Sequence, residues 1–110
     1  MLKKGKNILG AVLGEGWYKG PIGWSGVMHN YGQYLMYLAN LRIEFTDGTS
    51  TVIATDKSWK TSTGPIILST FLWGETYDSR QELGDWDRPG YDEGSWQDVV
   101  VTKFDAEYWD

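Results

Sequence analysis

The stretch that decides the fold is Tyr34-Leu35-Met36-Tyr37-Leu38-Ala39-Asn40-Leu41-Arg42-Ile43-Glu44-Phe45. Its odd-numbered positions are apolar throughout, whereas the even-numbered positions from 40 to 44 are Asn, Arg and Glu. A helix would place these polar residues around a face that also carries Leu41 and Ile43, so the alternation is typical of a strand with one buried face. The sequence therefore predicts a β-strand over Tyr34–Phe45.

The next residues predict a hairpin. Asp47-Gly48 is a two-residue turn signal in which both central residues favour positive φ. With Thr46 and Thr49 flanking the turn, apolar residues would meet on one face and mixed residues on the other. The predicted pairs are Phe45 with Ser50, Ile43 with Val52, Leu41 with Ala54, Arg42 with Ile53 and Glu44 with Thr51.

Towards the N-terminus, Gly14-Glu15-Gly16-Trp17-Tyr18-Lys19-Gly20-Pro21-Ile22-Gly23-Trp24 sets three large aromatic residues among four glycines and a proline. Glycine supplies positive φ and proline fixes φ, so this stretch predicts a tightly bent loop without a helix. Its aromatic side chains suit either a packed corner of a core or a platform on which a sugar ring stacks. Both interpretations stay open at this point.

Other short apolar segments lie between turn signals along the chain. They predict further strands at Asn7–Leu13, Trp59–Ser62, Ile66–Trp73 and Gln97–Thr102. Strands at this spacing are typical of a sandwich. We therefore expect an all-β, antiparallel β-sandwich domain over residues 1–102, of the jelly-roll or galactose-binding-like kind. Residues 103–110 are polar and acidic and predict a tail or linker toward a further domain.

The charge of the chain limits the classes of partner that it can bind. The net charge is −5 and no basic run extends beyond Lys3–Lys6, which argues against nucleic acid. No apolar run is long enough to cross a membrane and no signal-peptide pattern is present, so we expect a soluble chain of unknown compartment. The chain has no cysteine and one histidine, His29, so thiolate metal sites are excluded and a histidine-based catalytic site has little to work with.

Four stretches, in order along the chain, resemble the N-terminal β-sandwich domain of bacterial α-L-rhamnosidases, which are multi-domain glycoside hydrolases. They are Asn7–Gly10 through Gly14–Gly20, Leu41–Gly48, Thr55–Ile66 and Gly74–Arg80, and they are joined by Pro89–Asp92 and Ser95-Trp96. Nothing here resembles the helical (α/α)6 barrel that carries the catalytic carboxylates of that family. The resemblance thus implies a fragment that starts partway into an incomplete sandwich. At position 15, where the family often has Asn, this chain has Glu15.

The resemblance implies a non-catalytic accessory domain that supports the catalytic domain or substrate recognition, with no catalytic residue of its own. The alternative is a carbohydrate-binding module for rhamnose or a related sugar, assisted by calcium. The candidate binding residues are Trp17, Tyr18, Glu75, Asp78 and Arg80. Calcium takes six to eight oxygen ligands, and Glu75 and Asp78 alone supply too few, so we expect no cofactor, with calcium as the alternative. The purely structural alternative is that Glu75, Asp78 and Arg80 form a local ion-pair and turn network.

Two further expectations follow. A stand-alone glycosidase would need two carboxylates in a cleft, one with a raised pKa, and no pattern here singles out such a pair. An incomplete sandwich would leave Leu9, Val12, Leu35 or Leu41 facing water and a sheet edge unpaired, so we expect a homo-oligomer of the fragment.

Overall fold

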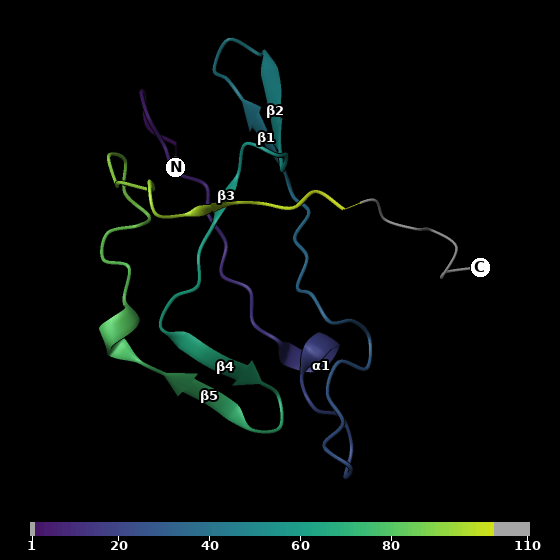
Figure 1. Ribbon diagram of the computed structural model, residues 1–110. Coiled ribbons are helices and arrows are strands. Elements are labelled where there is room, and N and C mark those ends of the chain that lie inside the picture. Colours follow the sequence, from purple (N-terminus) through teal and green to yellow (C-terminus); the bar gives the residue numbers. More distant parts are fainter. Residues whose placement is uncertain (1, 103–110) are drawn as a thin grey trace, which may run out of the picture. The chain divides into compact units, whose positions relative to one another are not determined.

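The computed structural model describes residues 2–102 (Figure 1). These residues divide into two compact units. One unit comprises residues 2–37 and 63–95, and the other residues 38–62 and 96–102. The first unit holds the helix α1 (Gly16–Lys19), the strands β4 (Ile66–Thr70) and β5 (Gly74–Tyr77), and the 3-10 helix η1 (Ser79–Gln81). The second holds β1 (Asn40–Glu44), β2 (Ser50–Ala54), β3 (Lys60–Thr61) and β6 (Gln97–Asp98).

The strands β1 and β2 form the predicted antiparallel hairpin, but the predicted register is wrong by one residue. Leu41 lies opposite Ile53 and Ile43 lies opposite Thr51. The turn explains the difference. Phe45 accepts a hydrogen bond from the Gly48 N–H at 3.0 Å and donates its own N–H to the Thr49 carbonyl at 2.9 Å, so three residues form the loop.

A two-residue turn of type I′ needs positive φ at both central positions, and here only Gly48 provides it, with a φ of 85°. Among the described residues other than glycine, only His29 has a positive φ. The loop therefore takes the three-residue form, in which a type I turn is followed by a left-handed glycine.

The strand predicted over Tyr34–Phe45 begins only at Asn40. Its partner β2 ends at Ala54, and one step further Thr55 donates its N–H to the Ala39 carbonyl at 3.0 Å. Residues 34–38 have no opposite strand within the described chain. Alternating side chains alone do not make a strand, because the backbone also needs a neighbouring strand with which to pair. The prediction was therefore wrong over residues 34–39 and at Phe45, which lies outside β1.

The strands β3 and β6 pair antiparallel and are shorter than the segments predicted for them. Lys60 lies opposite Asp98 and forms an ion pair with it. The Val99 N–H donates to the Trp59 carbonyl at 3.4 Å, which adds one further contact to this sheet.

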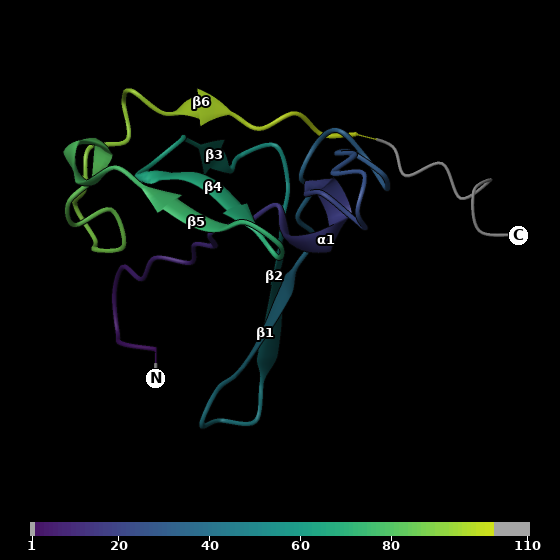
Figure 2. The ribbon, with the colours of Figure 1, turned by 90° about the horizontal axis from the view of Figure 1, so that it is seen from below.

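In the first unit, β4 and β5 form a second hairpin, drawn side by side in Figures 1 and 2. The strand predicted to run to Trp73 ends at Thr70, because residues 71–73 form the turn and Gly74 follows with a φ of 75°. The Thr70 hydroxyl accepts the Trp73 N–H at 3.1 Å and fastens this turn. The strand β5 was not predicted, because Glu75 and the charged residues that follow the strand, Asp78 and Arg80, resembled a polar cluster.

Two further predictions about residues 7–24 were wrong. The stretch predicted to contain no helix holds α1, a single turn in which the Glu15 carbonyl accepts the Lys19 N–H at 3.1 Å, ended by Gly20 and Pro21. The segment Asn7–Leu13 forms no strand and is exposed throughout. No residue of this segment pairs with a strand of the described chain.

Burial is slight throughout residues 2–102. Only Gly20, Pro21 and Thr70 are buried, and none of the large hydrophobic side chains is. Leu9 is 42% and Val12 is 66% exposed, while Leu35 and Leu41 are half-buried. The antiparallel all-β class that the sequence predicts is confirmed, with only short helical turns beside the strands.

Candidate functional site

All five predicted binding residues lie in the unit that contains the β4–β5 hairpin, but they do not lie at the same end of the hairpin. Trp17 and Tyr18 lie on α1, which is attached at the turn end through a bridge between Gly16 and Thr70. Asp78 and Arg80 follow β5 at the open end, where the Asp78 N–H donates to the Pro65 carbonyl at 2.8 Å. Four residue steps of about 3.3 Å separate the two ends of β4, so they lie about 13 Å apart. The structure does not bring the five side chains together.

Trp17 packs against the hairpin turn. Its ring centroid lies 4.8 Å from that of Phe71, with an angle of 31° between the two ring planes. Trp17 nevertheless remains 47% exposed and Phe71 68% exposed. The pair thus combines the two alternatives left open by the sequence: Trp17 is packed on one side and open to water on another.

Tyr18 is held by the chain that follows α1. The Tyr18 carbonyl accepts the Tyr31 N–H at 3.3 Å, and the phenol ring lies against the backbone of Gly32. A Cβ atom at position 32 would lie 2.1 Å from the Tyr18 hydroxyl oxygen, so this approach requires glycine. His29 lies in the same loop and donates its backbone N–H to the Lys19 carbonyl at 2.9 Å.

Glu15 anchors α1 to the edge of β4. One of its carboxylate oxygens accepts the Ser69 N–H at 3.2 Å, and the other lies 3.7 Å from the Lys19 ammonium. The Glu15 side chain is only 18% exposed. Both of its oxygens are therefore engaged within the fold, one by the Ser69 backbone and the other by the Lys19 side chain, so Glu15 holds α1 against β4.

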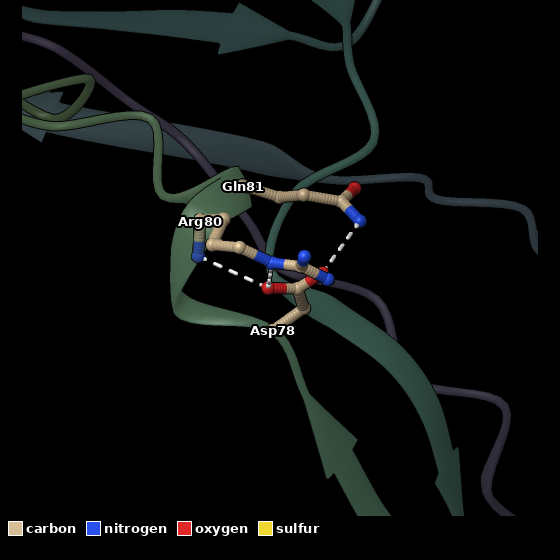
Figure 3. A network of polar contacts seen from close by, with 3 residues as sticks. All are labelled: Asp78, Arg80 and Gln81. Carbon is tan, nitrogen blue, oxygen red and sulfur yellow. Dashed lines mark hydrogen bonds and ion pairs between the residues drawn. The ribbon is translucent and has the colours of Figure 1, made fainter.

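Asp78 and Arg80 form the network shown in Figure 3. Asp78 Oδ1 accepts the Arg80 backbone N–H at 3.1 Å and Nε at 2.8 Å, while Oδ2 accepts Nη2 at 2.7 Å and Gln81 Nε2 at 3.3 Å. The Arg80 side chain and backbone lower the pKa of Asp78 from 3.8 to about 2, and Asp78 raises the pKa of Arg80. Asp78 and Arg80 therefore form the local ion-pair and turn network that was the purely structural alternative to sugar binding. Glu75 makes none of these bonds and lies on β5 opposite Ser69.

A pocket of about 180 Å³ lies beside this network, with Tyr77, Glu82 and Trp86 in its wall together with Pro65, Leu83 and Gly84. The Tyr77 hydroxyl donates to Glu82 Oε1 at 2.9 Å, and this bond raises the pKa of Tyr77. Sequence reasoning missed the pocket, because only the backbone path of the turn-rich segment brings Trp86 to the end of the hairpin. A second hollow of about 220 Å³ lies along β4 and includes Leu13, Glu15, Lys19 and Leu35.

Within residues 2–102, no group of three or more His, Cys, Asp or Glu side chains is arranged to hold a metal ion. No helix in that same range has the length and apolar character needed to cross a membrane.

Comparison with known proteins agrees with the sequence resemblance. Residues 1–109 match the α-L-rhamnosidase N-terminal domain family. This chain belongs to that family. An α-L-rhamnosidase of Streptomyces avermitilis is 41% identical over 95 residues, which are 86% of this chain and 9% of that protein. One from Formosa agariphila is 39% identical over 100 residues, again 86% of this chain and 10% of that protein.

Solved structures give the same result for the fold. The crystal structure of the native Aspergillus terreus α-L-rhamnosidase matches with a TM-score of 0.78 and 42% identity, covering 86% of this chain and 11% of that one. The Streptomyces avermitilis enzyme complexed with L-rhamnose matches with a TM-score of 0.72 and 42% identity, covering 78% of this chain and 8% of that one. The antiparallel strands and these neighbours are consistent with a β-sandwich, and this chain spans about a tenth of the length of the relatives it matches.

Proposed function

We propose that this chain is a non-catalytic accessory domain of a larger α-L-rhamnosidase-like glycoside hydrolase, in which it supports the catalytic domain. One observation carries the proposal. The family match covers residues 1–109, yet the matches to two α-L-rhamnosidases, each over 86% of this chain, cover only 9% and 10% of those relatives. Most of each relative, with room for the hydrolytic machinery, lies outside the matched part.

The electrostatics of the described carboxylates support this role. Glycoside hydrolysis requires a carboxylic acid whose pKa is raised, so that it can protonate the leaving group. The described carboxylates with a clearly shifted pKa are Asp47, Asp56 and Asp78, and in each the pKa is lowered. In each the largest cause is a hydrogen bond from a side chain two residues further on, which stabilises the charged form. These groups fasten turns and are poor proton donors near neutral pH.

Sugar binding is the second candidate, and the half-exposed Trp17 favours it. Its open face, with the neighbouring Tyr18 at 37% exposure, offers apolar area on which a sugar ring can lie. In this second proposal the sugar would bind at α1 without Asp78 and Arg80, which pair with each other at the far end of the hairpin. Calcium assistance through Asp78 would first require Arg80 to release the carboxylate.

The test compares two forms of the protein: the isolated chain and the complete product of its gene. We expect the complete product to release the aryl group from an aryl α-L-rhamnoside and the isolated chain to release none. Steady release by the isolated chain, abolished by one Asp or Glu to Ala change, would refute the accessory role. Titration of the isolated chain with L-rhamnose, with and without calcium, followed by Trp fluorescence, decides the second candidate separately.

A further inference from the structure

The two edges of the β4–β5 hairpin differ in how their backbone groups are used. At the outer edge of β4, the Ser69 N–H donates to the Glu15 carboxylate at 3.2 Å, and Thr70 forms a parallel bridge with Gly16. The loop around Glu15 therefore covers the outer edge of β4 at its C-terminal end. Gly14 also lies close to this edge, because a Cβ atom at its position would lie 3.1 Å from the Ser69 hydroxyl.

The outer edge of β5 has no such cover within residues 2–102. The Asp78 N–H points toward β4, where it donates to the Pro65 carbonyl at 2.8 Å. Backbone groups alternate in direction along an antiparallel strand, so those of Tyr77 and Glu75 point away from β4. The outward N–H of Ser69, which lies opposite Glu75, agrees with this alternation. All four residues of β5 are exposed, and in the described chain this strand pairs only with β4.

The sequence of β5 does little to protect this edge. Exposed edges are often blunted by charged side chains, above all Lys, by Pro or by a bulge, and Gly74-Glu75-Thr76-Tyr77 carries a single charge, at Glu75, and neither Lys nor Pro. The irregularity in this hairpin lies on β4, between Ile66 and Leu68. A two-stranded hairpin is also marginally stable in water unless further strands or packing support it. The edge is therefore suited to accept another strand.

We propose that the outer edge of β5 pairs with an extended strand from polypeptide beyond this chain, so that Glu75 and Tyr77 exchange backbone hydrogen bonds with it. The inference rests on the proposed function, because the relatives are about ten times longer than the matched part and have ample chain to supply such a strand. A strand that is neutral or basic opposite Glu75 fits better than a second copy of this chain, since two copies would each bring a net charge of −5.

Hydrogen exchange of the complete gene product, read at single-residue resolution across residues 71–82, tests the proposal. The Glu75 and Tyr77 amides should exchange at least about tenfold more slowly than the exposed amide of Gly84, because a paired edge amide exchanges only when its bond opens. The protection should not change on dilution. Exchange as fast as at Gly84 would overturn the proposal, and protection lost on dilution would assign the edge to a second copy and overturn it as well.

A matched pair of variants shows that the edge carries the effect. Glu75→Pro removes an N–H that points away from β4, and should abolish protection at Tyr77 while the Thr76 amide stays protected within the hairpin. Thr76→Pro removes an N–H of the hairpin itself and should expose both amides. If Glu75→Pro does not fold, Glu75→Lys replaces it, with Glu93→Lys as control. Lys on an edge strand discourages pairing with another strand, so Glu75→Lys should lower protection at Tyr77, and unchanged protection would overturn the proposal.

Activity of the same preparation separates this inference from the proposed function. An active enzyme with unprotected β5 amides refutes the strand pairing alone. An inactive product with protected amides supports the pairing and refutes the assignment as part of a rhamnosidase.

Discussion

The carboxylate of Glu15 accepts a hydrogen bond from the backbone N–H of Ser69, 3.2 Å away and 54 positions later in the chain. This contact joins the aromatic loop to the edge of β4, and the ion pair with Lys19 holds the same carboxylate over α1. The position of Trp17 over the hairpin turn therefore depends on a bond made by its neighbour two residues earlier.

Glu15→Ala should lower the free energy of unfolding by about 1–3 kcal/mol, because it leaves the Ser69 N–H without its acceptor in a partly buried place. Glu15→Gln should cost less, since the amide oxygen still accepts that bond. Urea unfolding followed by Trp fluorescence measures both changes. Glu93→Ala, at an exposed turn, is the control, and equal losses for Ala and Gln would assign the effect to the ion pair with Lys19.

Trp17 and Phe71 should be energetically coupled. A double-mutant cycle with Trp17→Ala, Phe71→Ala and the double variant should give a coupling energy of about 1 kcal/mol, as is typical of aromatic pairs in contact. The two rings lie 4.8 Å apart, and each contacts water as well as its partner. Additive losses would show that the rings do not interact in solution.

The same Trp17→Ala variant distinguishes packing from sugar binding. If the open face of Trp17 is a platform, the variant loses L-rhamnose affinity beyond what its lower stability explains. Phe71→Ala is the matched control, because it removes the packing partner and keeps the indole. A parent chain with no measurable affinity for L-rhamnose would leave packing as the role of Trp17.

The sequence predicted local features better than distant ones. The hairpin at Asp47-Gly48 and the pairing of Asp78 with Arg80 depend on residues within a few positions, and both exist. The hairpin register was missed because a two-residue and a three-residue loop share the same Asp-Gly signal, and only the φ of each residue separates them.

Contacts between distant segments could not be predicted from one sequence. Nothing in the spacing of Glu15 and Ser69, or of Trp17 and Phe71, indicates that they meet. The strand β5 was missed for a related reason: half of Gly74-Glu75-Thr76-Tyr77 is glycine and glutamate, which strands disfavour, and its pairing with β4 determines its conformation. Residues 103–110, predicted to be a tail or linker, lie outside the described residues, so that prediction and the single-domain boundary stay predictions.

Gly48→Val should destabilise the β1–β2 hairpin by about 1 kcal/mol or more, because a β-branched residue strongly resists positive φ. Gly48 has a φ of 85° and open space around it, so the cost is in the backbone and not in a clash. Gly48→Asn is the matched control and should cost less, since Asn tolerates this region. Amide exchange at Ile43 and Thr51, which form a hydrogen-bonded pair of this hairpin, reports the loss locally, and unchanged rates in the Val variant would contradict the three-residue turn.

Asp78 should titrate at about pH 2, below its ordinary value of 3.8. Because the pKa is lowered in the folded state, the stabilisation is fully present above pH 3.8 and is lost as the pH falls through about 2. The carboxyl carbon shift of Asp78 measures the midpoint by NMR. Arg80→Gln should raise it toward 3.8, whereas Arg88→Gln, which removes the partner of Asp85, should leave it unchanged. A midpoint near 4 in the parent would show that the ion pair does not form in solution.

The isolated chain should self-associate. Leu9 and Val12 are exposed, no large hydrophobic side chain of residues 2–102 is buried, and the outer edge of β5 is unpaired within that range. Apolar surface and free strand edges of this kind are normally covered, and a symmetric dimer is the commonest closed form. Light scattering at micromolar concentration should give about twice the chain mass of 12.5 kDa. Added salt should strengthen the association, because it screens the repulsion between two chains of net charge −5. A monomer of ordinary stability at every salt concentration would mean that the chain covers its own apolar side chains, and the expected oligomer would be wrong.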